Sequence, residues 1–368
     1  MNVTPVSAEL KTIESFLEVG WREGKIVSDD ITQAFELIID YWIVLFLSSL
    51  GVITNSLTLV VFLRQGFRDS VNVSLFSITV WDQVKCLAGV VYRLHKPLGL
   101  YKPVWGYNWK WMSGPYLVYL SIFAGFVSYA LATYVSIERC LSVSIPFKVR
   151  SFITPPITSS FMLGLSLIVF GSFCPMFLIY TIHYTYSPLY NASIVTVIPN
   201  HFYYARDGLI LKIYKFLGIF YPAIFCTIMI STSAIIVFHL RKSAENFDKM
   251  KGAKSTAAAT AGESSRVSTT VTPRELKVTK MLLVIILIYL MDFFPRVCKY
   301  TASLIEPEFF RYGKYHNLML VMSNVLWILD FVNASANFFI FLRMSTNFKK
   351  TFYMIFPKCS KLHDKDKV

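Results

Sequence analysis

The chain has 368 residues, of which 55% are hydrophobic and only 16% are charged, a balance that argues against one soluble globular domain. Its formal net charge of +14 is not gathered on one amphipathic surface, which argues against nucleic acid as a partner. Six cysteines without CxxC spacing or paired histidines give no support to a zinc or redox site.

The first 39 residues are predicted to form an extracellular tail. Counted to Asp40, this stretch holds eight acidic residues and shows no signal peptide, so the first apolar segment is expected to direct insertion. Asn2 stands in the sequon NVT, and Asn191 stands in the sequon NAS of a later loop. We expect both asparagines to be glycosylated outside the cell.

The apolar segments that follow predict an all-α membrane protein, a bundle of seven transmembrane helices over residues 40–343. Each segment is long enough to cross a hydrocarbon core of about 30 Å. Three segments carry isolated charges, but the uncharged runs are too long for the core of a soluble protein. The predicted spans are 40–64, 72–93, 111–140, 155–181, 212–240, 274–304 and 315–343.

The distribution of basic residues predicts the orientation of these helices. With the N-terminus outside, 21 of the 36 Lys and Arg residues fall in four cytoplasmic segments, and loops with such an excess stay inside. We therefore expect a multi-pass protein of the plasma membrane. The four segments are 64–71, 138–154, 241–280 and 343–368.

One cytoplasmic segment differs from the others in composition. Residues 251–275 are rich in Ser, Thr and Ala and contain no aromatic residue, so the loop 241–273 is predicted to be disordered. Its hydroxyl groups are either acceptors of phosphate or parts of a passive linker.

The adjacent residues Glu138 and Arg139 follow a run without charges from Trp111 to Ile137. A cation at the end of a span reaches the membrane surface at modest cost, so snorkelling explains it without any function. The second interpretation is that Arg139 pairs with Glu275, at the start of the sixth span, in one of two conformations. The sequence leaves both interpretations open.

Several motifs, in the same order along the chain, resemble those of the rhodopsin-like G-protein-coupled receptors over roughly residues 41–356. The acidic residue and Arg of SIERC match a family motif, with Cys140 in place of its aromatic residue. In NASANFFIF, Asn337 matches the seventh-helix motif, while Phe338 and Phe341 replace its Pro and Tyr. The other matches are Asn55 in GVITNSL, Asp82 in NVSLFSITVWD, Pro222 in GIFYPAIF and Pro295 in MDFFP.

The departures from the family pattern place the chain in a divergent branch, most similar to invertebrate peptide-type and chemosensory receptors. Gly114 stands where the family has one cysteine of its outer-loop disulfide, and Phe293 replaces the sixth-helix Trp. Ser121 stands where amine receptors have an Asp, and Phe331 stands where opsins have a Lys. The chain therefore resembles neither an aminergic receptor nor an opsin.

The resemblance implies two sets of functional residues. In the family, the second-helix Asp holds a sodium ion with polar partners, so Asp82 is either a sodium site or part of a hydrogen-bonded cluster without an ion. No other metal and no organic cofactor is expected. The polar core is Asn55, Asp82, Ser128, Asn333 and Asn337, and the activation switch is Glu138, Arg139, Glu275, Phe293, Pro295, Asn337 and Phe341.

Further charges inside the spans also allow two interpretations. Lys85 and Asp330 lie at similar depth on helices that the family fold makes neighbours, so an ion pair would neutralise both. Alternatively, the basic residues form the floor of a pocket for an anionic group, such as a peptide C-terminus or a small acidic odorant. The candidate pocket residues are Lys85, Ser121, Asp292, Arg296, Lys299 and Asp330.

Residues 344–368 are predicted to form a short amphipathic helix and a cytoplasmic tail. Phe348 and Phe352 are expected to face lipid, while Lys349 and Lys350 face the phosphates of the membrane surface. Cys359 follows this helix at a position suited to palmitoylation, with an unmodified thiol as the alternative.

Together these features predict a receptor and not an enzyme, since no catalytic triad, metal set or phosphate loop is recognisable. The resemblance implies an extracellular ligand, a chemosensory cue or a neuropeptide, and a heterotrimeric G protein, with arrestin and receptor kinases as further partners. The competing hypothesis is a seven-helix ligand-gated channel or transporter, because charges inside a membrane also mark ion paths. The sequence shows no internal repeat of the kind found in transporters, which favours the receptor.

Overall fold

The computed structural model describes residues 26–145, 152–204, 209–256, 273–306, 308–309 and 313–357. The side chains of residues 243–256 and 273–276 lie outside this description. Asn2 and Cys359 also lie outside the described residues, so their modifications stay predictions.

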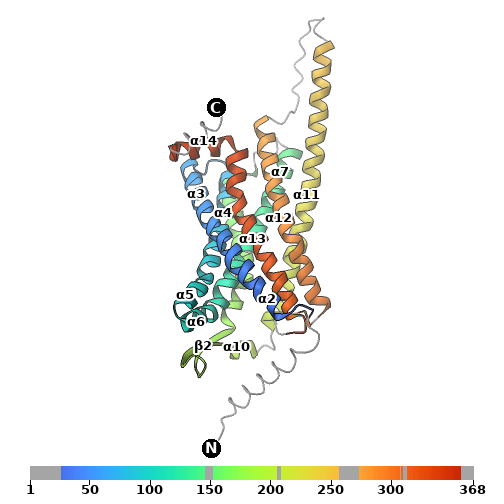
Figure 1. The fold of residues 1–368 in the computed structure, drawn as a ribbon. Helices are drawn as coiled ribbons and strands as arrows, with labels where there is room; N and C mark the ends of the chain where they lie inside the picture. The colour runs from blue at the N-terminus through green and yellow to red at the C-terminus, as the bar shows by residue number, and fades with distance from the viewer. Residues whose placement is uncertain are drawn as a thin grey trace, which may run out of the picture.

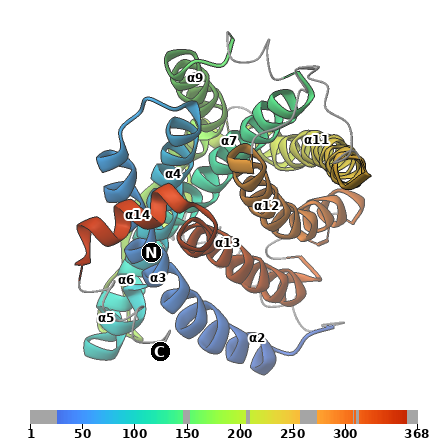
Figure 2. The same cartoon turned by 90° about the horizontal axis from the view of Figure 1, so that it is seen from above.

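The described residues include seven long helices. They run side by side and form one bundle (Figures 1 and 2). In the described part of the chain, six of them are long and apolar enough to cross a membrane. The seventh, α4, carries Asp82 and Lys85, which lower its hydropathy, but it packs between α3 and α7. The predicted seven-helix bundle is confirmed. Its helices are α3 (Val44–Gln65), α4 (Ser70–Arg93), α7 (Tyr119–Ser144), α9 (Pro155–Phe173), α11 (Leu209–Thr256), α12 (Pro273–Ile305) and α13 (His316–Met344).

The first helix begins earlier than predicted. α2 (Asp29–Phe35) and the π-helical turn η1 (Glu36–Ile43) lead directly into α3. Ser28 caps α2, because its Oγ accepts a hydrogen bond from the backbone N of Ile31 at 3.3 Å. Acidic residues in the first turn, Asp29 and Asp30, suit the positive end of the helix dipole. The boundary predicted at residue 40 is therefore too late by about three turns.

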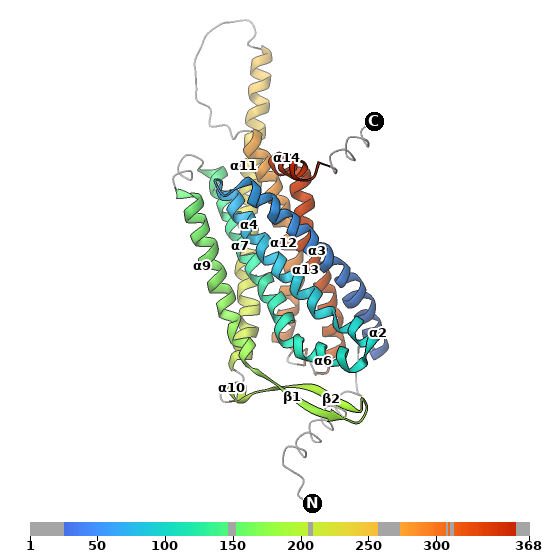
Figure 3. The ribbon, with the colours of Figure 1, turned by 90° about the vertical axis from the view of Figure 1, so that its left-hand side faces the viewer.

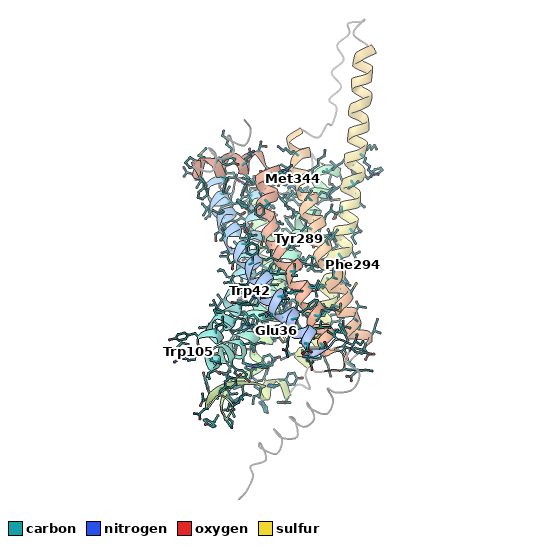
Figure 4. The ribbon with its side chains drawn as sticks, in the orientation of Figure 1. Glu36, Trp42, Trp105, Tyr289, Phe294 and Met344 are labelled. Atoms are coloured by element: carbon teal, nitrogen blue, oxygen red, sulfur yellow. The ribbon has the colours of Figure 1, made fainter. Side chains whose placement is uncertain are left out.

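Ion pairs explain why acidic residues belong to this helix and not to a solvated tail. Arg93 of α4 pairs with the Asp40 carboxylate, and its Nε donates to the Asp40 carbonyl oxygen at 2.8 Å. The same guanidinium lies over the Trp327 ring of α13, 5.7 Å from its centroid. Nearer the helix start, Glu36 Oε1 lies 2.7 Å from Lys110 Nζ; Glu36 is labelled in Figure 4. These contacts hold the first helix against its neighbours.

The third helix lies at the centre of the bundle. It continues without a break from α6 (Pro103–Ser113) and the turn η2 (Gly114–Val118). The four residues from Phe126 to Tyr129 are at most 1% exposed, so neighbouring helices cover every side of α7 there. Phe173 of α9 stacks on Phe123 and Phe126, with ring centroids 4.6 and 5.0 Å apart.

A β-hairpin, which the sequence did not predict, lies across the end of the bundle that is opposite α14 (Figure 3). Its strands are β1 (Tyr180–Ser187) and β2 (Ala192–Pro199), paired antiparallel with Tyr180 opposite Pro199. The fourth span, predicted to reach residue 181, ends as an α-helix at Phe173. The elements around the hairpin are η3 (Cys174–Leu178), α5 (His95–Tyr101) and α10 (His201–Tyr204).

Hydrogen bonds hold this hairpin in place. Asn108 of α6 accepts a hydrogen bond at Oδ1 from the backbone N of Val195, at 2.8 Å, and Val195 is only 1% exposed. At the far end of the hairpin, Asn200 Nδ2 donates to the carbonyl oxygen of Leu178 at 2.7 Å. The loop is thus attached to the third helix and to the end of the fourth.

The fifth helix continues far beyond its predicted end at residue 240. α11 runs to Thr256 and projects from the bundle at the end where α14 lies (Figures 1 and 3). Residues 241–256 include four Lys, two Ala, one Arg and one Met, which favour a helix, and extending a formed helix requires no new nucleus. The loop predicted to be disordered over 241–273 is therefore helical in its first part, while residues 257–272 lie outside the described residues.

The short helix after the seventh span, α14 (Thr346–Ile355), packs on the bundle. Ser345 caps it by accepting a hydrogen bond from the backbone N of Phe348 at 3.2 Å. Phe348 is 1% exposed and lies against Phe62 of α3 and Phe341 of α13, with ring centroids 5.6 and 5.5 Å away. The prediction that Phe348 and Phe352 face lipid is wrong, because α14 turns this face back onto α3 and α13.

Candidate functional site

Asp82 lies in the middle of α4, is fully buried, and is contacted by three other helices. Ser128 of α7 donates from Oγ to Asp82 Oδ1 at 2.9 Å, and Asn337 of α13 donates from Nδ2 to Oδ2 at 3.0 Å. The hydroxyl of Tyr289 on α12 lies 3.4 Å from Oδ2, and Figure 4 shows Tyr289 inside the bundle. One carboxylate therefore connects four helices.

Lys85, one turn further along α4, supplies the cation beside this carboxylate. Its Nζ lies 3.5 Å from Asp82 Oδ1, and its side chain is 1% exposed. Ser121 of α7, predicted as a ligand contact, donates from Oγ to the Lys85 carbonyl oxygen at 3.2 Å. Asp82 and Lys85 therefore form a buried ion pair within one helix.

A second cluster of charges joins the sixth and seventh helices. Arg296 of α12 pairs with Asp330 of α13 through its NH2 group. The hydroxyl of Tyr129 on α7 contacts Asp292 and lies 3.3 Å from Asp330 Oδ1. Asn333 donates from Nδ2 to Asp292 Oδ2 at 3.2 Å. Both carboxylates of this cluster are thus tied to α7 by one tyrosine.

These ion pairs differ from the predicted pair of Lys85 with Asp330, which is wrong. Lys85 pairs with Asp82 on its own helix, since a flexible lysine stem spans one helical turn. Asp330 pairs with Arg296, whose planar guanidinium suits a carboxylate better than an ammonium does. Both cations are thereby neutralised within the bundle.

Only two of the four predicted partners of Asp82 reach it, namely Ser128 and Asn337. Asn55 donates from Nδ2 to Cys86 Sγ at 3.8 Å, and Asn333 contacts the second cluster. Tyr289 is a partner of Asp82 that was not predicted from the sequence. It lies three residues before Asp292 and therefore on the same side of the sixth helix, which was the available signal.

The geometry does not suit a sodium ion at Asp82. A sodium ion on this carboxylate would stand about 4 Å from the Lys85 ammonium, and such charges repel by about 4 kcal/mol at an effective dielectric constant of about 20. In the described residues, the atoms of the two clusters without a hydrogen-bond partner are the donors Lys85 Nζ and Arg296 Nε and the acceptors Asp292 Oδ1 and Asn333 Oδ1. A cation satisfies acceptors alone. The hydrogen-bonded cluster without an ion is therefore favoured.

Lys299, one turn from Arg296 on α12, has a different environment from the other two cations. Its Nζ donates to Ser323 Oγ of α13 at 2.7 Å, and the side chain is partly exposed. In the described part of the chain, Lys85 and Arg296 pair with carboxylates, whereas Lys299 belongs to no ion pair. Of the three predicted pocket cations, Lys299 is the one that belongs to no ion pair of the described residues.

At the opposite end of the bundle, Arg139 is held by its neighbour Glu138. The Arg139 NH2 group lies 2.5 Å from Glu138 Oε1. The Glu138 carboxylate also accepts hydrogen bonds from Ser70 Oγ at 2.8 Å and Ser74 Oγ at 3.2 Å, both on α4. We call this group of four residues, Glu138, Arg139, Ser70 and Ser74, the latch. In the latch, Glu138 holds Arg139 on the same helix, and the two serines of α4 hold Glu138.

Residues 42–359 match the family described as serpentine type 7TM GPCR chemoreceptor Srw, and this range includes all seven long helices. The chain belongs to the Srw family of chemoreceptors. No curated protein matches the chain. The family match confirms the predicted multi-pass membrane receptor of the G-protein-coupled type, and it confirms that the chain is not an enzyme.

In this Srw receptor, the residue in place of the sixth-helix Trp packs against the third and fifth helices. Phe293 is fully buried, and its ring centroid lies 3.8 Å from that of Tyr129, in an edge-to-face arrangement. It also lies 6.5 Å from the ring of Phe225 on α11. The next residue, Phe294, is 69% exposed on the outer surface (Figure 4), and Pro295 follows within the helix. A displacement of α12 must therefore change the contact between Phe293 and Tyr129 of α7.

The predicted contact of Arg139 with Glu275 stays a prediction for this Srw receptor. The backbone of α12 begins at Pro273, which places Glu275 in the first turn of the helix. The side chain of Glu275 lies outside the described residues.

The Srw receptor also has an apolar cavity of about 170 Å³, at the hairpin end of α9 and α11. The predicted pocket residues do not line it; it is lined by residues that include Phe173, Met176, Ile210 and Tyr214. The hydroxyl of Tyr214 lies 3.3 Å from that of Tyr300, the residue after Lys299 on α12. Tyr300 thus links α12 to the wall of the cavity, while Lys299 is not among the residues that line it.

Proposed function

We propose that the protein is a plasma-membrane chemoreceptor that binds a small acidic ligand outside the cell and activates a heterotrimeric G protein. The observation that carries this proposal is the latch. It restrains Arg139, a member of the predicted activation switch, at the end of the bundle where α14 lies. A ligand that binds the released state more tightly than the latched state shifts the population toward signalling.

A receptor needs an active G protein for its response, whereas a channel does not. We expect cells that express the protein to show nucleotide exchange on a Gα subunit, and any membrane current to disappear when G proteins are inhibited. The measurement is ligand-evoked exchange and whole-cell current in the same cells. A current that persists without active G protein would support the competing channel.

Lys299 and the cavity indicate the class of ligand. Lys299 has a hydroxyl partner, Ser323, but belongs to no ion pair of the described residues, so it can bind an anionic group at low cost. The cavity at the hairpin end of α9 and α11 is apolar and suits a small hydrocarbon body. A small organic acid meets both requirements, and the carboxylate of a peptide C-terminus shares only the first.

Replacing Lys299 by glutamine is expected to lower the potency of an acidic ligand at least tenfold, because a charge-assisted hydrogen bond of about 1.5 kcal/mol or more is lost. The measurement is a dose–response series with small carboxylic acids, each compared with its primary amide. Lys212→Gln is the matched control, since Lys212 is an exposed lysine near the hairpin end of α11. Equal loss of potency for acid and amide would contradict the assignment of Lys299.

The proposed orientation places Asn2 and Asn191 outside the cell. Asn191 ends the hairpin turn with φ of 45°, which asparagine tolerates, and it is exposed. Glycosidase treatment is expected to increase the mobility of the expressed protein on a gel, and Asn2→Gln with Asn191→Gln is expected to abolish this shift. An N-terminal tag that antibodies reach only after permeabilisation would contradict the orientation.

Receptor kinases and arrestin are further proposed partners. The support for them is the hydroxyl-rich segment 251–275, whose first six residues belong to the projecting end of α11 and whose composition suits it to accept phosphate.

A further inference from the structure

We infer that Lys85 is a built-in counter-ion that takes the place of a bound sodium ion at Asp82, so that sodium does not stabilise this receptor. The two residues are three positions apart on α4, and Lys85 Nζ lies 3.5 Å from Asp82 Oδ1. A covalently attached ammonium is present in every molecule, whatever the salt concentration outside. The inference does not depend on the proposed ligand or G protein.

The surroundings of Lys85 keep its ammonium in this position. Its side chain is enclosed, with Gly125 of α7 so close that an added Cβ would stand 3.8 Å from Lys85 Cδ. Asp330 and Asp292 also act electrostatically on the ammonium, beside Asp82. Leaving this position would separate one cation from three carboxylates inside a medium without bulk water.

One of the remaining contacts of Asp82, the amide nitrogen of Asn337, is also unsuited to a metal ion. Ser128, Asn337 and Tyr289 all direct hydrogen-bond donors at the carboxylate. An alkali cation needs oxygen lone pairs around it, and the amide nitrogen of Asn337 offers none. The carboxylate is therefore satisfied by three donors and one ammonium.

The experiment measures thermal unfolding of the purified full-length receptor in sodium chloride and in choline chloride at equal ionic strength. For the wild type we expect midpoints that agree within about 1 °C. For Lys85→Met, which leaves Asp82 without its cation, we expect sodium to raise the midpoint by about 2 °C or more, with saturation. Lys299→Met is the matched control, because this lysine belongs to no ion pair of the described residues, and it should stay insensitive to sodium.

A saturable, sodium-specific stabilisation of the wild type would overturn the inference, and this result does not depend on any variant folding. Should Lys85→Met fold poorly, the double variant Asp82→Asn with Lys85→Met replaces it. We expect the double variant to unfold at a higher temperature than Asp82→Asn alone, which leaves a buried ammonium unpaired. A double variant no more stable than Asp82→Asn would also overturn the inference.

Discussion

Replacing Arg139 by alanine is expected to reduce G-protein activation to background while the receptor still reaches the cell surface. The arginine is held by Glu138 near the end of α7, and its side chain is 12% exposed. Its partner Glu138 keeps two hydrogen bonds, from Ser70 and Ser74. The measurement is nucleotide exchange on Gα, normalised to the surface level.

The opposite result is expected when the latch is weakened instead of its arginine removed. Glu138→Gln replaces a charged acceptor by a neutral one, at a cost of about 1.5 kcal/mol for the latched state. Ligand-free activation should therefore rise roughly tenfold. Ser74→Ala, which removes one hydrogen bond to Glu138, should change it in the same direction. Ser77→Ala is its matched control, since Ser77 lies on the same helix but donates to the carbonyl oxygen of Val73.

Equal ligand-free signalling from Glu138→Gln and wild type would remove the latch from the mechanism. Glu275→Ala then separates the two hypotheses for Arg139. A rise with Glu275→Ala alone supports the predicted pair between the third and sixth helices, whereas a rise with Glu138→Gln alone supports the local partner.

The largest expected loss of folded receptor follows from breaking the pair between Arg296 and Asp330. Both side chains are buried, and Asp330 is also contacted by the hydroxyl of Tyr129. Asp330→Asn leaves the guanidinium without its carboxylate, and breaking a buried pair in this way costs about 3–5 kcal/mol. A natural protein has about 5–15 kcal/mol in total, so surface expression should fall at least several-fold.

The double variant Arg296→Met with Asp330→Asn is the test of this explanation. It removes both charges, so we expect it to recover most of the surface level that Asp330→Asn loses. Lys299→Met, one turn away on the same helix, should stay near wild type. Surface labelling measures the surface level, and thermal unfolding measures the stability. A double variant with a surface level as low as that of Asp330→Asn would show that the broken pair does not cause the loss.

The helices of the bundle could be predicted because their signal is local. A run such as 111–137 without one charge identifies itself as a membrane span in any fold. The start of the first helix could not be found in this way. Glu36 and Asp40 look like parts of a polar tail until their partners Lys110 and Arg93 are brought to them by other helices.

The choice of partner for each buried charge was also beyond the sequence. In the family fold, Asp82 and Asp330 both lie within reach of Lys85. Spacing alone does not show which of these carboxylates it pairs with. The Arg296 side chain points toward Asp330 and pairs with it, so Asp82 is the carboxylate left for Lys85. The hairpin was missed for a different reason. Its strand residues, TIHYTY, are of β-forming types but directly follow an apolar run, and the predicted span 155–181 includes the first two residues of β1.

The attachment of the outer hairpin has a consequence for redox chemistry. The sequence contains no cysteine between Cys174 and Cys226, so no disulfide can join the hairpin to α6. The hydrogen bond between Asn108 and the backbone of Val195 attaches the hairpin instead. A hydrogen bond of this kind is indifferent to thiols and to the oxidising machinery of a secretory compartment. The attachment of the hairpin to α6 is therefore the same in a reducing and in an oxidising medium.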